Sequence, residues 1–359
     1  VLERQGFIRP HMADENDKRT IYMVDMHEPL MFLHNLDTTI KEPFASNPAV
    51  LDAVEKNHKK LQIAMTKLYP GNLVLTLSSG IMYHRLVDRI TALNDVPREP
   101  LVPRRLGKNM CVPFGKILRG KVVPNTVTKT LHTDKVYEPD LNSFTIEPFP
   151  YYSPLKSQIE TIKSFDRPVI LVDDLVHTAN RLQVLVPQLR EDGIPIKKVV
   201  VGVLSGYGRD LMQCLKVPVE SIYSMPNLRQ WFVESTLYPF IGGDTVRREE
   251  MKVAGLQPSI NMILPYATPR LSGCSREALV EFSACCIENS RDLFQVLEAE
   301  YRKMYAKNLT LSRLSEAVIL PLCPDKGSCM EYDENLAASV YLENDLETLW
   351  RMKEFLIKG

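Results

Sequence analysis

The chain has 359 residues, which is enough for one large α/β domain with appendages or for two modest domains. Its composition, 45% hydrophobic and 25% charged, is that of an ordinary globular protein. Lys+Arg and Asp+Glu are equal at 44 each, so no whole-molecule field favours nucleic acid or a membrane, and no apolar run reaches the roughly 18 to 20 residues of a membrane-spanning helix.

The first 45 residues carry no chemical motif. The opening VLERQGFIRP lacks the apolar core of a signal peptide, and seven cysteines without paired spacing do not indicate a disulfide framework. We therefore predict a reducing, cytoplasmic location. The stretch LERQGFIRP is similar to the end of an acetyltransferase domain, which implies a further module before Val1. Residues 1–45 are expected to form an N-terminal extension.

A helix is predicted for SNPAVLDAVEKNHKKLQIAMTKLYPG, because Ser46 or Asn47 can cap its start, Pro48 suits the first turn and the final Pro-Gly stops it. NLVLTL then predicts a strand, and residues 81–93 predict a helix. The Pro- and Arg-rich segment that continues to about residue 155 predicts hairpins or mobile loops.

In the middle of the chain the pattern becomes regular. Apolar runs predict strands at 168–172, 198–204 and 219–224, with helices between them. Continuous apolar strands joined by helices indicate a parallel sheet that is covered on both faces. We therefore predict an α/β domain over residues 46–265 and a mainly helical C-terminal region over residues 266–359.

The stretch VILVDDLVHTANRL, residues 169–182, places two carboxylates where the first of these strands ends. Ligands of parallel sheets bind at the carboxyl ends of the strands. Asp173 and Asp174 can accept hydrogen bonds from vicinal sugar hydroxyls or hold Mg²⁺ through water, and the helix start that follows suits a phosphate. The alternative is a solvated turn or helix cap. A phospho-receiver domain is excluded, because strand 198–204 runs into VLSGYG without an acceptor aspartate.

This stretch resembles the binding signature for phosphoribosyl pyrophosphate (PRPP) in the type I phosphoribosyltransferases. The resemblance implies an α/β parallel-sheet core of that family's type, PRPP or a nucleotide as small-molecule ligand, and Mg²⁺ as cofactor. It puts Asp173 and Asp174 on the ribose hydroxyls, with the metal held through water or through those hydroxyls. The residues that it implies for the 5′-phosphate loop are His177, Thr178, Ala179, Asn180 and Arg181.

The loop departs from the family pattern at three positions. The family usually has glycine at Ala179, a small residue or glycine at Asn180, and commonly threonine at Arg181. Alanine lacks the freedom of glycine at positive φ, so a less tightly wound loop is expected. Arg181 could pair bidentately with phosphate, or it could plug the pocket.

Two upstream segments follow the order of the family. Ser78, Ser79 and Gly80 lie between a predicted strand and helix, as a pyrophosphate loop would, although plain helix capping is the alternative. Residues 101–135 hold eight Lys/Arg and one acid, which matches the family's flexible basic loop over the pyrophosphate, or a solvated loop. The basic residues predicted to act there are Lys116 and Arg119 as catalytic groups and Lys121 and Lys129 as binding groups.

Downstream of the last predicted strand, QWFVESTLYPFIGGD corresponds to the variable hood with which the family recognises the base. Trp231 is the candidate to stack on a base, although such aromatic residues also seal cores and dimer interfaces. The tail from Ser275 has Leu, Glu, Lys and Arg at helical spacing, which suits a cap or a homodimerisation element.

Three functions are compatible with these features. The first is Mg²⁺-dependent transfer of a phosphoribosyl group from PRPP to a nitrogenous base. The second is a non-catalytic, regulatory module of a multidomain protein that binds a nucleotide or ribose phosphate. The third is RNA binding through the basic stretch 101–135, which its sparse aromatic residues argue against.

Overall fold

The computed structural model describes residues 9–12, 20–23, 25–103, 105–118, 121–248, 253–269, 271, 273–326 and 331–358. The chain divides into two compact units. Unit 1 comprises the described residues up to Thr76, residues 137–142 and the described residues from Arg229 onward, and unit 2 comprises the described residues of 77–136 and 143–228. Each unit has its own hydrophobic core.

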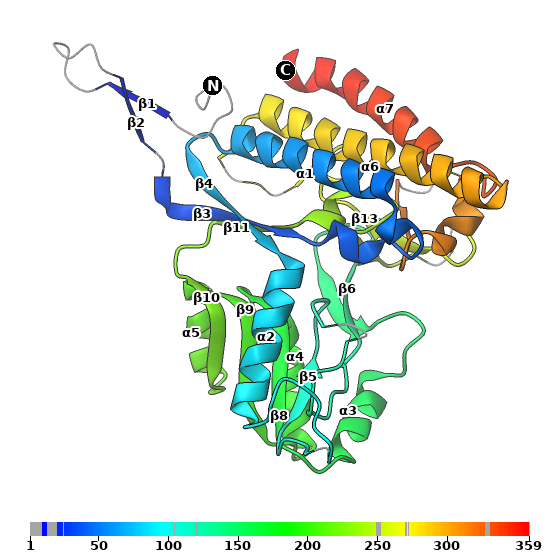
Figure 1. Cartoon of the computed structure of the whole chain (residues 1–359). Helices are drawn as coiled ribbons and strands as arrows, with labels where there is room; N and C mark the ends of the chain where they lie inside the picture. The colour runs from blue at the N-terminus through cyan, green and yellow to red at the C-terminus, as the bar shows by residue number, and fades with distance from the viewer. Residues whose placement is uncertain are drawn as a thin grey trace. The chain divides into compact units, whose positions relative to one another are not determined.

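Unit 2 is built on a four-stranded parallel sheet with the order β10–β9–β8–β5 (Figure 1). Its strands are β5 (Met110–Pro113), β8 (Val169–Val176), β9 (Ile196–Ser205) and β10 (Val219–Met225). The apolar residues at the centre of β8 and β9 are fully buried, as expected for strands that are covered on both faces. The predicted α/β class with a parallel-sheet core is confirmed.

Helices cover both faces of this sheet. Side chains of Val169 and Leu171 share a core with α3 (Leu155–Lys163), α4 (Asn180–Glu191) and α5 (Gly206–Cys214). Helix α2 (Ser79–Leu93) packs on β9 and β10, and its Met82 meets the sheet at Gly202. Asp173 follows Val169 and Leu171 at the strand period of two, so it lies on the α4 side of the sheet, and its carboxyl also interacts with that of Asp174.

The segment up to about residue 155 was predicted to contain hairpins or mobile loops, and its consecutive strands β6 (Thr133–Tyr137) and β7 (Phe144–Pro148) are neighbours in one sheet, as in a hairpin. Strand β5 lies in the same segment and was not predicted. All four of its residues are buried, and they pair with Val169–Val172 of β8. On the other side, Cys111 bridges Thr128 in parallel. Four apolar residues among prolines and basic residues carry no periodic signal, and only the pairing with β8 makes them a strand.

The strand predicted at NLVLTL forms as β4 (Asn72–Ser78), but not in the parallel sheet of unit 2. It belongs to a three-stranded sheet of order β11–β3–β4, in which β3 (Asp25–His34) pairs in parallel with β11 (Gln230–Val233). The predicted N-terminal extension therefore contributes β3 to the core of unit 1.

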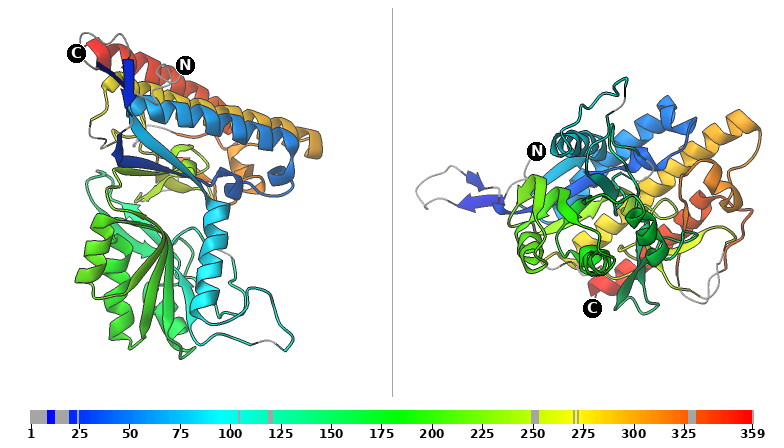
Figure 2. Two further views of the ribbon diagram at one scale, coloured as in Figure 1. Left: turned by 60° about the vertical axis from the view of Figure 1, so that its left-hand side comes forward. Right: turned by 90° about the horizontal axis from the view of Figure 1, so that it is seen from below.

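Three long helices complete unit 1: α1 (Pro48–Leu68), α6 (Arg276–Tyr305) and α7 (Ala338–Lys358). They lie side by side, α1 on α6 and α6 on α7 (Figures 1 and 2). Helix α1 is capped as predicted, because the side chain of Asn47 accepts the N–H of Ala49 at 2.9 Å. The predicted helical character of the C-terminal region is confirmed.

The compact units have limits other than the predicted boundaries at residues 45/46 and 265/266. Helix α1 was predicted to belong to the central domain, yet its apolar face packs on α6 of the C-terminal region. Packing between helices more than 200 residues apart depends on the shapes of both faces, which a pattern in one segment does not report.

The remaining elements are short. They are β1 (Arg9–Met12), β2 (Thr20–Met23), η1 (Leu36–Thr39), η2 (Phe44–Ser46), β6 (Thr133–Tyr137), β7 (Phe144–Pro148), η3 (Glu234–Leu237), β12 (Asp244–Val246), β13 (Gln257–Ile260), η4 (Leu311–Glu316) and β14 (Leu322–Pro324). No helix of the described residues combines the length and apolar character that crossing a bilayer requires. No disulfide joins the six cysteines that the structure describes. Arg119, which was predicted as a catalytic group, lies outside the described residues. The predicted module before Val1 lies outside them as well.

The packing of α2 on the sheet can be tested at Gly202. A methyl group there would lie 2.2 Å from Met82 Sδ and 2.7 Å from the carbonyl oxygen of Asp174. We expect Gly202→Ala to lower the free energy of unfolding by about 1–3 kcal/mol. In the double variant with Met82→Ala, the total loss of free energy of unfolding should be smaller than the sum of the two single losses by about 1 kcal/mol or more. Urea denaturation measures both, with Gly80→Ala as a control, because its methyl would meet only Ser78 Oγ at 3.6 Å. Strict additivity would contradict this packing.

Candidate functional site

Segments on both sides of β5 pair with it in parallel, and the acid pair follows the part of β8 that pairs with β5. After β5 the chain runs outward to residues 127–131 on one side and then returns to β8 on the other. The ladder between β5 and β8 ends with the bond from the N–H of Phe114 to the carbonyl of Val172, at 3.0 Å. Ligands of open parallel sheets bind at such a switch point, outside the carboxyl ends of the strands.

Asp173 lies directly after this last ladder bond and is 3% exposed. Its Oδ1 accepts the backbone N–H of Asp174 at 2.9 Å, and its Oδ2 lies 3.7 Å from the guanidinium of Arg181. Gly115 packs so closely that a methyl group there would lie 1.6 Å from Oδ1. A residue with a side chain at position 115 would therefore displace the carboxylate, and sequence reasoning missed this role of the glycine.

Burial raises the pKa of Asp173 well above its ordinary value, and the neighbouring charge of Asp174 raises it further. Arg181 acts in the opposite direction but does not cancel these effects. The strand thus holds a carboxylate in a place that disfavours its charge, and a ligand that donates hydrogen bonds to it would relieve this cost.

Asp174 is only partly buried, and its Oδ1 accepts the N–H of Leu175 at 2.8 Å. Each carboxylate of the pair therefore has one oxygen held by the next backbone N–H, while Oδ2 is left for other partners. Hard oxygen ligands of this kind suit Mg²⁺ bound through water, so the residues fit the predicted ion. A metal ion that binds Oδ2 of Asp173 would have to displace the guanidinium of Arg181.

The predicted phosphate loop leads from β8 into α4. Ala179 adopts a left-handed conformation with φ 51°, the conformation that glycine favours, so the loop keeps its winding without glycine. No side chain caps α4, and the amide of Asn180 donates to Thr178 Oγ1 at 2.8 Å. The first N–H groups of α4 are therefore without a side-chain acceptor, which suits an anion.

His177 anchors this loop to the start of α5. Its Nδ1 lies 2.8 Å from Ser205 Oγ, and that oxygen also accepts the N–H of Gly208 at 2.9 Å. The ring packs edge-on against Tyr207, with 5.8 Å between the centroids. Burial lowers the pKa of His177, which favours the neutral imidazole. These contacts give His177 a structural partner in addition to the predicted role at a phosphate.

Arg181 leaves the first turn of α4 and reaches back to Asp173. Its Nε is buried and has no hydrogen-bond partner. Arg181 therefore lies beside the acid pair, and both interpretations of this side chain stay predictions. A phosphate oxygen could satisfy Nε, which would free Asp173 at the same time.

Ser78, Ser79 and Gly80 start α2, but the strand before them belongs to the three-stranded sheet and not to that of Asp173. Ser79 is buried and its hydroxyl has no hydrogen-bond partner. Within the described chain, no hydrogen bond or ion pair joins these residues to the acid pair. The turn that does follow the neighbouring parallel strand is residues 114–118, directly after β5.

Of the predicted basic residues, Lys116, Lys121 and Lys129 are exposed. Lys116 follows Gly115 in the turn after β5, and the ammonium of Lys121 lies 4.5 Å from the centre of the Tyr83 ring. The described part of the basic stretch is anchored by buried Phe114, Leu118, Val123, Asn125 and Leu131, so it packs on the core instead of forming a free loop.

Trp231 lies in β11 of unit 1 and is half-buried. Its neighbours Phe232, Tyr238 and Phe240 are buried in the core of that unit. This aromatic segment therefore seals a core, while stacking of Trp231 on a base stays a prediction.

Comparisons with known proteins add little to this geometry. No protein-family model matches the chain, and no curated protein matches it. Among solved structures, it is similar to a purine phosphoribosyltransferase from Pyrococcus horikoshii, at 10% identity and a TM-score of 0.26, over 43% of this chain and 88% of that one. A likeness of this size carries no argument, so the strand order and the site stand on the structure alone.

The cost of burying Asp173 predicts a pH-dependent effect of Asp173→Asn. A carboxyl with a raised pKa contributes stability below its ordinary pKa, of about 3.9, that is lost as the pH rises through the raised value. The amide does not ionise, so we expect the variant to gain about 0.5–2 kcal/mol in free energy of unfolding at about pH 7 and less at about pH 4.5. Urea denaturation at both pH values measures it. Exposed Asp166→Asn is the control, and an equal gain at both pH values would argue against this account.

The backbone at Ala179 gives a second prediction. Ala179→Gly should raise the free energy of unfolding by about 0.5–1 kcal/mol, because relief at positive φ exceeds the entropy that glycine adds to the unfolded chain. Ala306 ends α6 at φ 54°, so Ala306→Gly is a control with the same backbone conformation. Thermal denaturation compares the two. Stabilisation at 306 alone would mean that the loop is not strained at 179.

Proposed function

We propose that unit 2 binds PRPP or a ribose-5-phosphate nucleotide with Mg²⁺ at the carboxyl ends of β5 and β8, and transfers the phosphoribosyl group to a nitrogenous base. The observation that carries this proposal is the pairing of Asp173 with the uncapped start of α4 at one switch point. A carboxylate whose Oδ2 accepts no hydrogen bond from the described residues and a helix start that lacks a side-chain acceptor are complementary to the two ends of a ribose 5-phosphate.

Each group has a separate task in this proposal. The Oδ2 atoms of Asp173 and Asp174 accept the ribose hydroxyls, and the N–H groups of residues 178–181 bind the 5′-phosphate. The turn after β5 brings Lys116 to the departing pyrophosphate, whose charge it offsets as the glycosidic bond breaks. Mg²⁺, when bound, would neutralise charge on the pyrophosphate. Rate enhancement then depends mainly on positioning and electrostatics.

The ion pair between Arg181 and Asp173 favours a second candidate, a non-catalytic module that binds a nucleotide or ribose phosphate. A guanidinium 3.7 Å from the ribose-binding carboxylate competes with the metal and the hydroxyls for the same oxygen. A ligand with a phosphate can displace it, but at the expense of affinity, and a regulatory module tolerates weaker binding than an efficient transferase does.

The first test is calorimetric titration of PRPP with Mg²⁺ into the full chain. We expect micromolar affinity for the wild type, and a loss of about 10- to 100-fold or more in Asp173→Asn/Asp174→Asn, because hydrogen bonds to charged groups are removed. Asp166→Asn, in the exposed connection between α3 and β8, should bind like the wild type. Absence of heat with PRPP, ribose 5-phosphate and nucleotides alike would overturn the proposal.

Turnover separates the two candidates. If PRPP binds, pyrophosphate release in the presence of a panel of purine and pyrimidine bases supports the transferase, and its absence with all of them supports the binding module. Arg181→Ala should strengthen binding of ligands that carry ribose hydroxyls but no phosphate, because the plug at Asp173 is removed.

A further inference from the structure

A second group of convergent polar side chains lies in unit 1, built by His34, His58 and Glu234. His34 ends β3, and Glu234 follows β11 directly. Because Leu33 pairs with Val233 in this parallel ladder, the next residue of each strand reaches the same edge of the sheet. Two residues 200 positions apart thus become neighbours through strand register.

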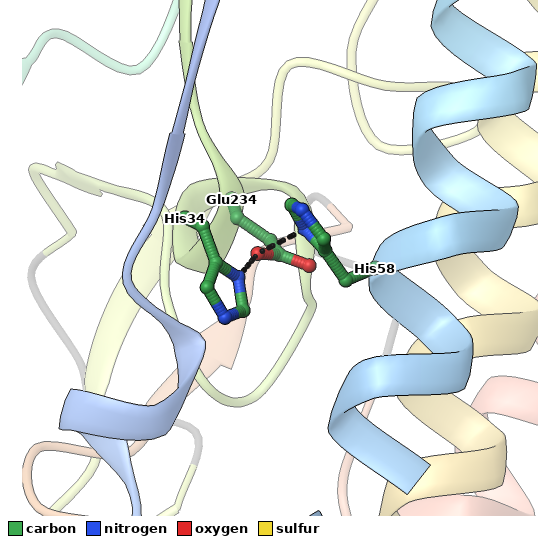
Figure 3. Close-up of side chains that lie close together, drawn as sticks. All are labelled: His34, His58 and Glu234. Carbon is green, nitrogen blue, oxygen red and sulfur yellow. Dashed lines mark hydrogen bonds and ion pairs between the residues drawn. The ribbon is translucent and has the colours of Figure 1, made fainter. Parts of the chain in front are cut away.

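His58 completes the group from α1. Its ring stacks on Phe32 of β3, with 5.4 Å between the centroids and 10° between the planes. Phe32 and His34 are two residues apart on one strand and share a face, so the stacking directs His58 toward His34. The two imidazole centroids are 4.1 Å apart. Figure 3 shows both rings directed at the carboxylate of Glu234.

The ligand atoms of the three side chains all lie within 4.8 Å of one another. Nδ1 of His34 contacts Glu234 Oε2, and Nδ1 of His58 lies 3.1 Å from the same oxygen. A tetrahedral ion with bonds of about 2.1 Å separates its ligand atoms by about 3.4 Å, so small side-chain rotations are enough to admit one.

The carboxylate of Glu234 is a buried charged group. Its side chain is fully buried, and its other oxygen lies 3.4 Å from the hydroxyl of Tyr238. No Lys or Arg of the described residues pairs with it. The described groups that face this charge are the imidazoles of His34 and His58, whose hydrogen bonds stabilise the carboxylate, and a cation beside a buried carboxylate stabilises it further. A divalent ion between the three side chains would be such a cation.

The backbone around the group is fixed by a second layer of hydrogen bonds. Asn35, next to His34, accepts the N–H of Ser235 at 2.9 Å and donates to Ser235 Oγ at 2.9 Å. Ser235 follows Glu234, so the two ligand-bearing segments are clamped to each other. Such outer contacts hold metal ligands in position in known sites.

We propose that His34, His58 and Glu234 bind one divalent transition-metal ion. Two imidazole nitrogens and one carboxylate oxygen are ligands that Zn²⁺ and non-haem Fe²⁺ accept, whereas Mg²⁺ and Ca²⁺ prefer oxygen alone. Three protein ligands leave at least one position for water, and the half-buried imidazoles, 22% and 14% exposed, leave that side open to solvent. This site is independent of the proposed ribose-phosphate site in unit 2.

The test uses the full chain after chelator treatment and dialysis. Calorimetric titration with Zn²⁺ is expected to give one equivalent per chain, and Co²⁺ to give visible absorption bands of a site with nitrogen ligands. His34→Ala, His58→Ala and the isosteric Glu234→Gln should each weaken Zn²⁺ binding by at least about 100-fold, because loss of an outer contact alone costs 10- to 100-fold. His84→Ala, whose Nδ1 contacts Arg98 in unit 2, should bind like the wild type.

Circular dichroism of each metal-free variant separates loss of the site from loss of the fold. Asn35→Ala keeps all three ligands, so it should retain the Co²⁺ bands with affinity lowered by about 10- to 100-fold. The proposal is overturned if the folded wild type takes up none of Zn²⁺, Co²⁺, Mn²⁺ or anaerobic Fe²⁺. It is equally overturned if folded Glu234→Gln binds Zn²⁺ as the wild type does, since the ion would then lie elsewhere.

Discussion

The carboxylate of Asp173 is buried because β8 is covered on both faces, and the ion pair that it makes within the described residues is with a guanidinium 3.7 Å away. The groups around this carboxylate are arranged to accommodate its buried charge. Gly115 allows the turn after β5 to approach the oxygen, the N–H of Asp174 satisfies one lone pair, and Arg181 crosses from α4 to the other. A strand that tolerates such a residue loses stability in exchange for a preformed acceptor, as functional sites commonly do.

The carboxylate of Glu234 is also buried, but its pKa shifts in the opposite direction from that of Asp173. Burial alone would raise its pKa, but hydrogen bonds from His34 and His58 outweigh that effect and the pKa is lowered. At Asp173 the neighbouring charge of Asp174 adds to burial, and the pKa is raised. Both carboxylates stand at the carboxyl ends of parallel strands, so the partners that surround them decide whether the pKa is raised or lowered.

The loop between β8 and α4 holds Ala179 in a left-handed conformation, which glycine adopts more easily than alanine does. Ala179 is held at φ 51° because the chain on both sides is fixed, by His177 on Ser205 and by the helix that Asn180 begins. Local strain of this kind persists when surrounding contacts determine the backbone. An alanine at this position therefore costs conformational energy while the backbone keeps the left-handed conformation.

Local patterns in the sequence determined where several helices and strands form and which residues mark the candidate site. Apolar runs and caps located α1, α4, β8 and β9, and two adjacent acids after an apolar strand marked Asp173 and Asp174, because side-chain period and helix capping are properties of short segments. Tertiary structure alone decided the rest. Four buried residues became β5 through pairing with β8, β4 joined another sheet, and strand register brought His34 to Glu234. These outcomes depend on contacts between residues far apart in the chain, which no local pattern contains.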